Sequence, residues 1–248
     1  MSELSDRVLA GDARAIARAI SLIEDDTSEG AALSHEVSGR PGHAYLIGVT
    51  GPPGAGKSTL VDRLTATLRP GSTVGILAVD PSSPFSGGAV LGDRVRMQSH
   101  SGDEGVFIRS MATRGHLGGL ARATAEAAMV LDAAGKDFVI IETVGVGQAE
   151  VDIVRTADVT IVVLVPGAGD EVQALKAGIM EIADIFVVNK ADRDGADRVV
   201  SEIESNLSLN TYGPGQWRPP IVKTVATTGR GIPELLDAID AFRAQSRP

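Results

Sequence analysis

Seven short hydrophobic runs, rich in Val and Ile, follow one another along most of the chain. They are nearly continuous rather than alternating with polar residues, which is typical of strands buried on both faces. Stretches of helical length separate most of them. This alternation predicts a three-layer α/β fold, a mostly parallel sheet flanked by helices. The expected strands are Ala44–Val49, Thr73–Val79, Val106–Ile108, Phe138–Ile141, Val159–Val165, Ile185–Val188 and Ile221–Val225, and the expected helices are Lys57–Leu68, Leu117–Ala134, Glu171–Ile182, Gly195–Leu207 and Pro233–Phe242.

The first 40 residues have a different pattern. Apolar residues recur there at helical spacing, at Leu4, Val8, Ile16, Ile20 and Ile23. Gly11 suits the end of one helix, and Asp12 can cap the start of the next. The polar stretch Asp25–Gly42 predicts a linker. We therefore expect a helical pair plus linker in residues 1–40, packed on a single domain over residues 41–248.

Residues 51–59 join the first expected strand to the first long helix and match the phosphate-loop pattern G-x-x-x-x-G-K-[ST]. They read Gly51-Pro52-Pro53-Gly54-Ala55-Gly56-Lys57-Ser58-Thr59. The glycines let backbone N–H groups turn inward around phosphate oxygens, and the helix N-terminus adds its positive dipole end. We expect Lys57 to bridge the β- and γ-phosphates and the Ser58 hydroxyl to bind Mg²⁺. The strand–loop–helix context predicts a P-loop NTPase fold.

A second motif follows the expected strand Ile185–Val188 and reads Asn189-Lys190-Ala191-Asp192. The Asp192 carboxylate can accept both the N1–H and the N2–H₂ of guanine, while Asn189 can hydrogen-bond N7. Adenine lacks both donors, so an unpaired carboxylate would reject it. N-K-x-D in this position resembles the guanine-specificity motif of GTPases. A further base contact, mainly from backbone N–H groups, is expected in the loop Thr224-Val225-Ala226-Thr227.

Mg²⁺ needs one or two carboxylates besides the phosphates. Asp80 and Glu142 each end an expected strand, on the phosphate side of the sheet. A helix cap or a turn is the alternative role for either residue, and for a third acid, Asp93, a helix cap is equally consistent. We expect the metal ligands to be Ser58, Asp80, Asp93 and Glu142, and the catalytic groups to be Lys57, Asp93 and Glu142.

The composition of the chain excludes several classes of binding partner and site. The 23 Lys and Arg residues against 32 Asp and Glu give a net charge of −9, which offers no general attraction for nucleic acid or anionic lipid. The absence of cysteine excludes disulfides, Cys-ligated zinc and iron–sulfur clusters. No apolar run reaches the roughly 18 residues of a membrane span, and the N-terminus has no signal pattern. We expect a cytoplasmic protein that binds neither nucleic acid nor membrane.

The joint set of motifs resembles the MeaB/ArgK family, SIMIBI-class P-loop GTPases. The matching segments are Asp80–Gly88, Leu91–Met97, Phe107–Ser110, Arg114–Gly119, Glu142–Gln148, Asp170–Gln173, Gly178–Glu181 and Asn189–Asp192. The resemblance implies a GTPase that binds GTP or GDP with Mg²⁺ and escorts an adenosylcobalamin-dependent acyl-CoA mutase such as methylmalonyl-CoA mutase. It implies gating of cofactor loading and protection of the mutase from inactivation. It also implies a mutase-sensing loop within Pro166–Lys176.

Several alternatives stay open. One is a P-loop kinase or ATPase linked to arginine or ornithine transport, which Asp192 disfavours because that residue selects guanine. Another is a nickel-type metal-insertion GTPase, which would need His and Cys clusters. Family members usually continue into a C-terminal dimerisation arm, whereas this chain ends at Pro248, so we expect a monomer or weak homodimer. For Arg109 and Arg114 a solvated or structural role is favoured over an arginine finger, and Trp217 is expected to anchor packing.

Overall fold

The computed structural model describes residues 2–39, 42–80, 98–100, 102–112, 117–143, 156–167 and 180–246. Within them a seven-stranded sheet has the order β3-β2-β4-β1-β5-β6-β7, and every neighbouring pair is parallel. All strands therefore end at the same edge, which is where ligands bind in such sheets. The strands are β1 Tyr45–Thr50, β2 Val74–Asp80, β3 Val106–Ala112, β4 Phe138–Thr143, β5 Val159–Leu164, β6 Ile185–Val188 and β7 Ile221–Lys223.

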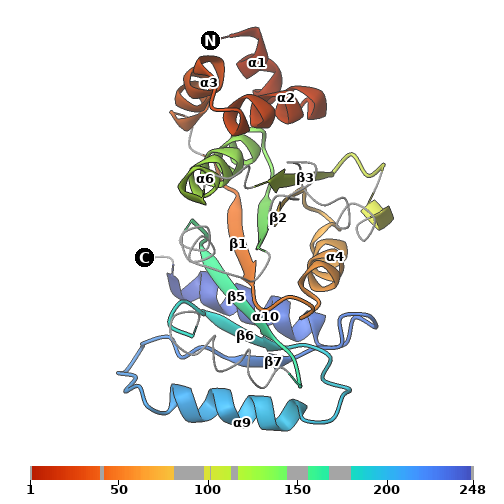
Figure 1. Ribbon diagram of the computed structural model, residues 1–248, viewed down its shortest axis with the longest axis vertical. Coiled ribbons are helices and arrows are strands. Elements are labelled where there is room, and N and C mark those ends of the chain that lie inside the picture. Colours follow the sequence, from red (N-terminus) through yellow and green to blue (C-terminus); the bar gives the residue numbers. More distant parts are fainter. Residues whose placement is uncertain are drawn as a thin grey trace.

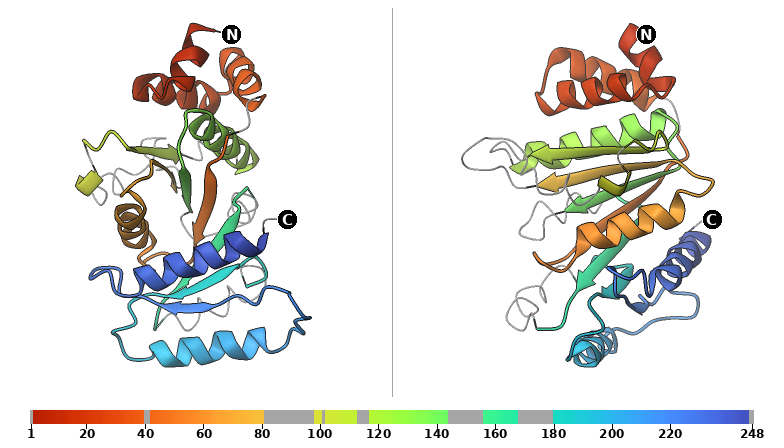
Figure 2. Two further views of the ribbon diagram at one scale, coloured as in Figure 1. Left: turned by 180° about the vertical axis from the view of Figure 1, so that it is seen from behind. Right: turned by 90° about the vertical axis from the view of Figure 1, so that its right-hand side faces the viewer.

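Helices cover both faces of the sheet, which confirms the three-layer α/β fold (Figures 1 and 2). On one face, α4 (Lys57–Leu68) and α10 (Ile232–Ser246) pack on alternate residues of the central strands, such as Ile47 and Ile161. On the other face, α6 (Leu117–Ala133) packs on β2 and β4, and α9 (Ala196–Leu207) packs on β5 and β6. The central strands are buried on both faces, as their continuous apolar sequence predicts.

The N-terminal segment contains three helices, so the predicted helical pair plus linker is wrong in its second half. They are α1 Glu3–Leu9, α2 Ala13–Glu24 and α3 Ser28–Ser38. Asp12 caps α2 as expected, because its carboxylate accepts from Arg14 N at 2.8 Å and Ala15 N at 3.0 Å. The third helix lies inside the predicted linker Asp25–Gly42, where Thr27 caps it and Leu33 is buried.

The three N-terminal helices form an additional layer over α6 and the edge strand β3 (Figures 1 and 2). Ile16 and Ile20 of α2 share one apolar cluster with Leu131 of α6. β3 continues to Ala112, four residues beyond the predicted strand, and carries Arg109 in its second half. The N-terminal segment is thus packed on the half of the sheet that contains β2, β3 and β4.

Smaller details also differ from the sequence prediction, such as β4, which ends at Thr143, and α10, which ends at Ser246. β7 ends at Lys223 rather than Val225, because Val225 instead bridges to Arg230 in an antiparallel turn. Residues 180–182 form a turn, and the rest of the predicted helix Glu171–Ile182 lies outside the described residues. A single-turn 3₁₀ helix, η1, spans Gln98–His100.

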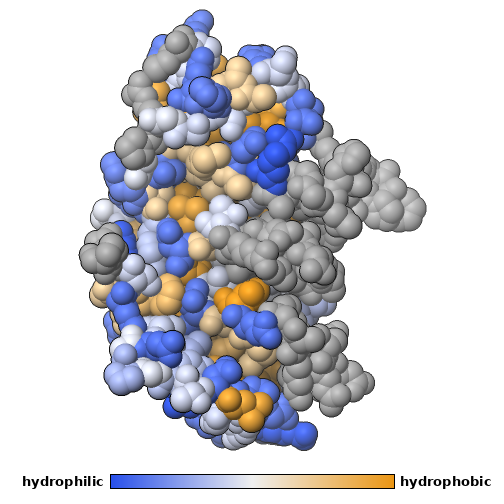
Figure 3. Space-filling view, turned by 90° about the vertical axis from the view of Figure 1, so that its left-hand side faces the viewer, coloured by the Kyte–Doolittle hydropathy of each residue, from blue (hydrophilic) through white to orange (hydrophobic). Residues whose placement is uncertain are grey.

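The surface of the described residues mixes hydrophilic and hydrophobic groups. On the face drawn in Figure 3, hydrophobic residues occur in small, separated areas. Across the described part of the chain, no helix has the length and apolar character of a bilayer-spanning segment.

Candidate functional site

The loop between β1 and α4 is shaped by close neighbours at two of its glycines. Gly51 has φ +142°, and a Cβ there would lie 2.1 Å from the Val163 carbonyl oxygen of β5. Gly56 has φ +88°, and a Cβ there would lie 2.5 Å from Asn189 Nδ2. Any side chain at either position would force the adjoining backbone or Asn189 to move. Glycine is therefore required at both positions for two reasons: its backbone adopts a positive φ, and a side chain would clash with a neighbour.

Lys57, the first residue of α4, holds its ammonium inside this loop. The residue is 6% exposed, and Nζ donates to the Gly51 carbonyl at 2.7 Å and to the Pro52 carbonyl at 3.0 Å. The cation thus lies on the inner side of the turn, beside the N-terminus of a helix. A buried lysine at this place provides positive charge where phosphate oxygens would approach.

Ser58 and Glu142 meet although 84 residues separate them, because β1 and β4 are neighbours in the sheet. The Ser58 hydroxyl donates to Glu142 Oε1 at 2.6 Å, and the two residues are 6% and 5% exposed. Val49 of β1 lies opposite Glu142 in the register, which brings the β4 carboxylate to the start of α4. A hydroxyl and a carboxylate in contact are the oxygen donors that suit Mg²⁺.

The other two predicted metal ligands are less fully defined. Asp80 is the last residue of β2, and Ala78 of that strand pairs with Glu142, so the Asp80 backbone lies at the same edge of the sheet. Its side chain lies outside the described part of the structure. Asp93 lies outside the described residues, as do Arg114 and most of the predicted mutase-sensing loop Pro166–Lys176.

Asn189 connects the phosphate loop to the loop that follows β7. It is 2% exposed, and its amide Nδ2 donates to the Ala55 carbonyl at 2.8 Å. Its Oδ1 accepts from Thr224 Oγ1 at 3.0 Å and from Ala226 N at 3.1 Å. An amide NH₂ has two hydrogens, so one donor remains for a ligand atom such as guanine N7. Asn189 therefore fixes two loops in addition to its predicted contact with a base.

Lys190 adds a second link to the phosphate loop. Its backbone has φ +56°, and its Nζ donates to the Gly54 carbonyl at 2.7 Å. Ala191 N donates to the Thr224 carbonyl at 3.0 Å. This bond holds the Asn189–Asp192 motif against the loop Thr224–Thr227 that follows β7, hereafter the third loop. Asp192 follows in an exposed position, open to a ligand. Three separate segments are therefore held together here: Gly51–Thr59, Asn189–Asp192 and Thr224–Thr227.

The third loop has its own internal structure. Val225 N donates to the Arg230 carbonyl at 2.9 Å, so this N–H group is engaged within the turn. Ala226 N points to Asn189 Oδ1, as described above, and Thr227 accepts at its carbonyl from Arg63 of α4 at 3.3 Å. Thr224 was expected in this loop, but the role of its hydroxyl in positioning Asn189 was not predicted. Thr224 fell inside the predicted strand Ile221–Val225, so no local pattern marked this role.

Two further residues singled out in the sequence have structural roles, as favoured. Arg109 donates to Ser21 Oγ at 2.9 Å and forms a salt bridge with Glu24, so it joins β3 to α2. Trp217 Nε1 donates to the Asp184 carbonyl at 2.7 Å, and its ring packs edge-on against Phe242 at 5.1 Å between centroids. Both are packing anchors.

The chain is similar to proteins of one known family. A family model described as "Methylmalonyl Co-A mutase-associated GTPase MeaB" matches residues 16–247. A Pyrococcus abyssi protein provisionally named a GTPase is 56% identical over 246 residues, covering 98% of this chain and 76% of its own length. GTPase ArgK of Escherichia coli is 38% identical over 251 residues, with the same coverage of 98% and 76%. A crystal structure of an LAO/AO transport system kinase superposes with a TM-score of 0.78 at 31% identity, covering 98% of this chain and 74% of that one.

Proposed function

Because the chain belongs to the MeaB family of methylmalonyl-CoA mutase-associated GTPases, and is itself a GTPase, we propose that it serves an adenosylcobalamin-dependent acyl-CoA mutase such as methylmalonyl-CoA mutase. In this proposal GTP binding and hydrolysis gate the loading of adenosylcobalamin and protect the mutase from inactivation. The family description supports the choice of mutase. The observation that carries the nucleotide part is the Asn189 side chain, which ties the phosphate loop to the third loop, the two segments between which we propose that the nucleotide binds.

The phosphate loop, residues 51–59, would receive the triphosphate. Its backbone N–H groups and the N-terminus of α4 would surround the phosphate oxygens. Lys57 would exchange the Gly51 and Pro52 carbonyls for the β- and γ-phosphates, so that a buried cation moves only locally when GTP binds. Its contact with the γ-phosphate would stabilise the charge that develops during hydrolysis.

Ser58 and Glu142 are the pair that fits Mg²⁺, with Asp80 and Asp93 as further candidate ligands. In the structure the Ser58 hydroxyl donates to Glu142 at 2.6 Å, so a metal would take the serine oxygen and leave the carboxylate to hold it directly or through water. Mg²⁺, when bound, neutralises phosphate charge and orients the γ-phosphate. The burial of both residues keeps bulk water away from this oxygen pair.

The base would lie between Asn189–Asp192 and Val225–Thr227. Asp192 would accept from guanine N1–H and N2–H₂, and the free Asn189 donor would reach N7. The N–H of Ala226, now bonded to Asn189 Oδ1, would be shared with the guanine carbonyl oxygen. This arrangement predicts selection of guanine over adenine by at least several tens of fold, since adenine would leave a carboxylate unpaired.

Calorimetry with the substitution Asp192→Asn tests the base assignment. Wild type should bind GTP far more tightly than ATP, and the variant should shift its preference toward xanthosine triphosphate, because the amide offers a donor to the xanthine carbonyl. Asp194→Asn, which removes the same charge from an exposed position two residues away, is the matched control. Equal binding of ATP and GTP by wild type would overturn the guanine assignment.

Turnover measured with and without a purified mutase tests the partner. GTP hydrolysis should be slow for the protein alone and faster with the mutase, and Lys57→Ala should abolish both rates. Adenosylcobalamin transfer to the mutase should depend on whether GTP or GDP is bound. A rate that no mutase changes, with cofactor loading independent of nucleotide, would refute the chaperone role while leaving the GTPase assignment intact.

A second candidate function comes from the similar crystal structure of an LAO/AO transport system kinase. It would require phosphoryl transfer from ATP to a protein or small-molecule acceptor. The same preparation incubated with labelled ATP and with labelled GTP separates the two possibilities. Labelled acceptor formed from ATP, with no release of phosphate from GTP, would favour the kinase.

A further inference from the structure

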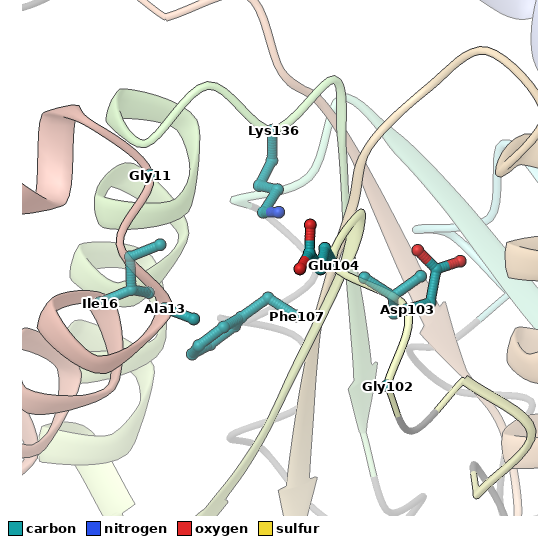
Figure 4. Close-up of a pocket in the computed structure, with 9 residues that line it drawn as sticks. Gly11, Ala13, Ile16, Gly102, Asp103, Glu104, Phe107 and Lys136 are labelled. Carbon is teal, nitrogen blue, oxygen red and sulfur yellow. The ribbon is translucent and has the colours of Figure 1, made fainter.

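A pocket lies at the edge of the sheet opposite the phosphate loop, where β3 and β4 begin (Figure 4). Its walls come from the N-terminal helices at Gly11, Ala13 and Ile16, from the 102–107 segment, and from Lys136 in the turn before β4. Its volume is about 180 Å³. A cavity of roughly 150 Å³ is enough to hold benzene. The pocket therefore has room for a ligand about the size of one substituted ring.

Lys136 directs its ammonium group into this pocket (Figure 4). The residue is 9% exposed, and its ammonium makes no hydrogen bond or salt bridge that involves a described residue. Lysines are almost never buried to this degree unless they are paired. Burial, and then the charge of Arg69, lower the pKa of Lys136. The pocket thus contains a buried cation that lacks a direct counter-ion.

Of the three acids near Lys136 in the described part of the chain, Glu104 forms no salt bridge with it, and Asp103 and Asp137 are committed to other donors. Asp103 accepts from the Arg69 guanidinium at 2.9 Å and from Gly105 N at 2.8 Å. Asp137 accepts from Thr73 N at 2.7 Å and from the Thr73 hydroxyl at 2.9 Å. Neither acid reaches the ammonium. A negative group brought by a ligand would supply the missing partner.

The wall opposite the ammonium is apolar. Ile16 is fully buried, and Phe107 turns its ring toward Ile16 and Ala13 of α2 (Figure 4). The exposed Glu104 lies at the rim and adds negative charge there. That charge disfavours a multiply charged anion such as phosphate more than a single carboxylate.

We propose that this pocket binds a small organic monocarboxylate, with its carboxylate on Lys136 and its apolar body against Phe107 and Ile16. The ligand would touch α2, the 102–107 segment and the turn before β4 at the same time. It would therefore strengthen the packing of the N-terminal helices on the sheet. This site is separate from the nucleotide site and does not depend on the proposed function.

Titration of the full chain with benzoate, followed by NMR of the Ile16 methyl groups, tests the proposal. Wild type should show saturable shifts in the millimolar range, and Lys136→Met should weaken binding at least tenfold. Ala13→Trp, which fills the exposed rim while keeping Lys136, should block binding. Arg198→Met is the matched control, because it removes a cation that is 84% exposed on the distant helix α9. Benzyl alcohol and inorganic phosphate should bind at least tenfold more weakly than benzoate.

A measurement on wild type alone makes the test independent of how the variants fold. The pKa of Lys136, followed through its ¹³Cε shift, should rise when benzoate saturates the pocket, because a carboxylate favours the charged form. An unchanged pKa would overturn the proposal. So would benzoate binding of equal strength in Lys136→Met, or phosphate binding as tight as benzoate.

Discussion

Asn189→Ala should destabilise the nucleotide-free protein, before any effect on a ligand. The substitution removes three hydrogen bonds, to the Ala55 carbonyl, the Thr224 hydroxyl and Ala226 N. The side chain is 2% exposed, so its partners cannot all recover water. At about 1 kcal/mol for each bond, the loss is about 3 kcal/mol in the free energy of unfolding. For a chain of this size that corresponds to a fall of roughly 6–12 °C in melting temperature.

Urea denaturation without nucleotide measures this loss directly, and calorimetry with GDP gives the second readout. GDP affinity should fall as well, because the phosphate loop and the third loop are no longer held together. Asn206→Ala is the matched control: its amide makes one bond, to the Glu202 carbonyl at 2.9 Å within α9. If Asn189→Ala stays within about 0.5 kcal/mol of wild type, as surface substitutions do, the bridging role is refuted.

Three further predictions concern the metal, the N-terminal helices and alkaline pH. Glu142→Ala should raise the Mg²⁺ concentration needed for half-maximal GTP turnover, and unchanged Mg²⁺ dependence would remove Glu142 from the metal site. Arg109→Met should cost about 3–5 kcal/mol in urea denaturation because Glu24 stays buried without its cation, and adding Glu24→Gln should restore part of the loss. Burial raises the pKa of Tyr45 to about 12 from an ordinary value of 10.0, so the folded state resists ionisation and stability should fall as the pH rises from 10 to 12. Tyr45→Phe should remove this fall in stability. At pH 7 it should leave the free energy of unfolding unchanged, since the hydroxyl has no hydrogen bond within the described residues. Denaturation at pH 8 and pH 11 measures both effects.

The sequence predicted the strands best where both faces are buried. β1, β5 and β6 match their predicted ranges to within one residue, because apolar side chains occupy nearly every position. β3 was predicted four residues short, since Arg109 and Ser110 interrupt the apolar run. The charge of Arg109 is tolerated there only because α2 supplies Glu24, a partner 85 residues away that no local pattern reveals.

α3 was missed for a related reason. Only Leu33 and Val37 mark a buried face along its 11 residues, and the rest of the helix is small or polar. Gly30 fits it closely against α2, because a Cβ there would lie 2.4 Å from the Leu22 carbonyl oxygen. Packing against α2 and α6 therefore decides this helix more than its own sequence does.

In the candidate site, too, the contiguous motifs were predicted and the contacts between distant segments were not. The phosphate loop and the Asn189–Asp192 motif are contiguous, and each was predicted with its flanking strand. The link from Asn189 to Ala55 spans 134 residues, and it emerges only when β1 and β6 are placed in one sheet. The pocket around Lys136 could not be predicted at all, because its lining comes from separate segments and its defining feature is a missing counter-ion.

The position of β1 in the middle of the sheet has a consequence for synthesis of the chain. Ile47 of β1 pairs with Ile140 of β4, so β1 has no neighbouring strand to pair with until another 93 residues have been synthesised. At ribosomal speeds that wait is roughly 5–20 s. During this time the apolar strand and the phosphate loop are already made, whereas Asn189, which holds the loop at Ala55, has not yet been added. The complete nucleotide site can therefore form only late in synthesis, so nucleotide binding can stabilise the fold only after Asn189 and the loop that follows β7 have been made.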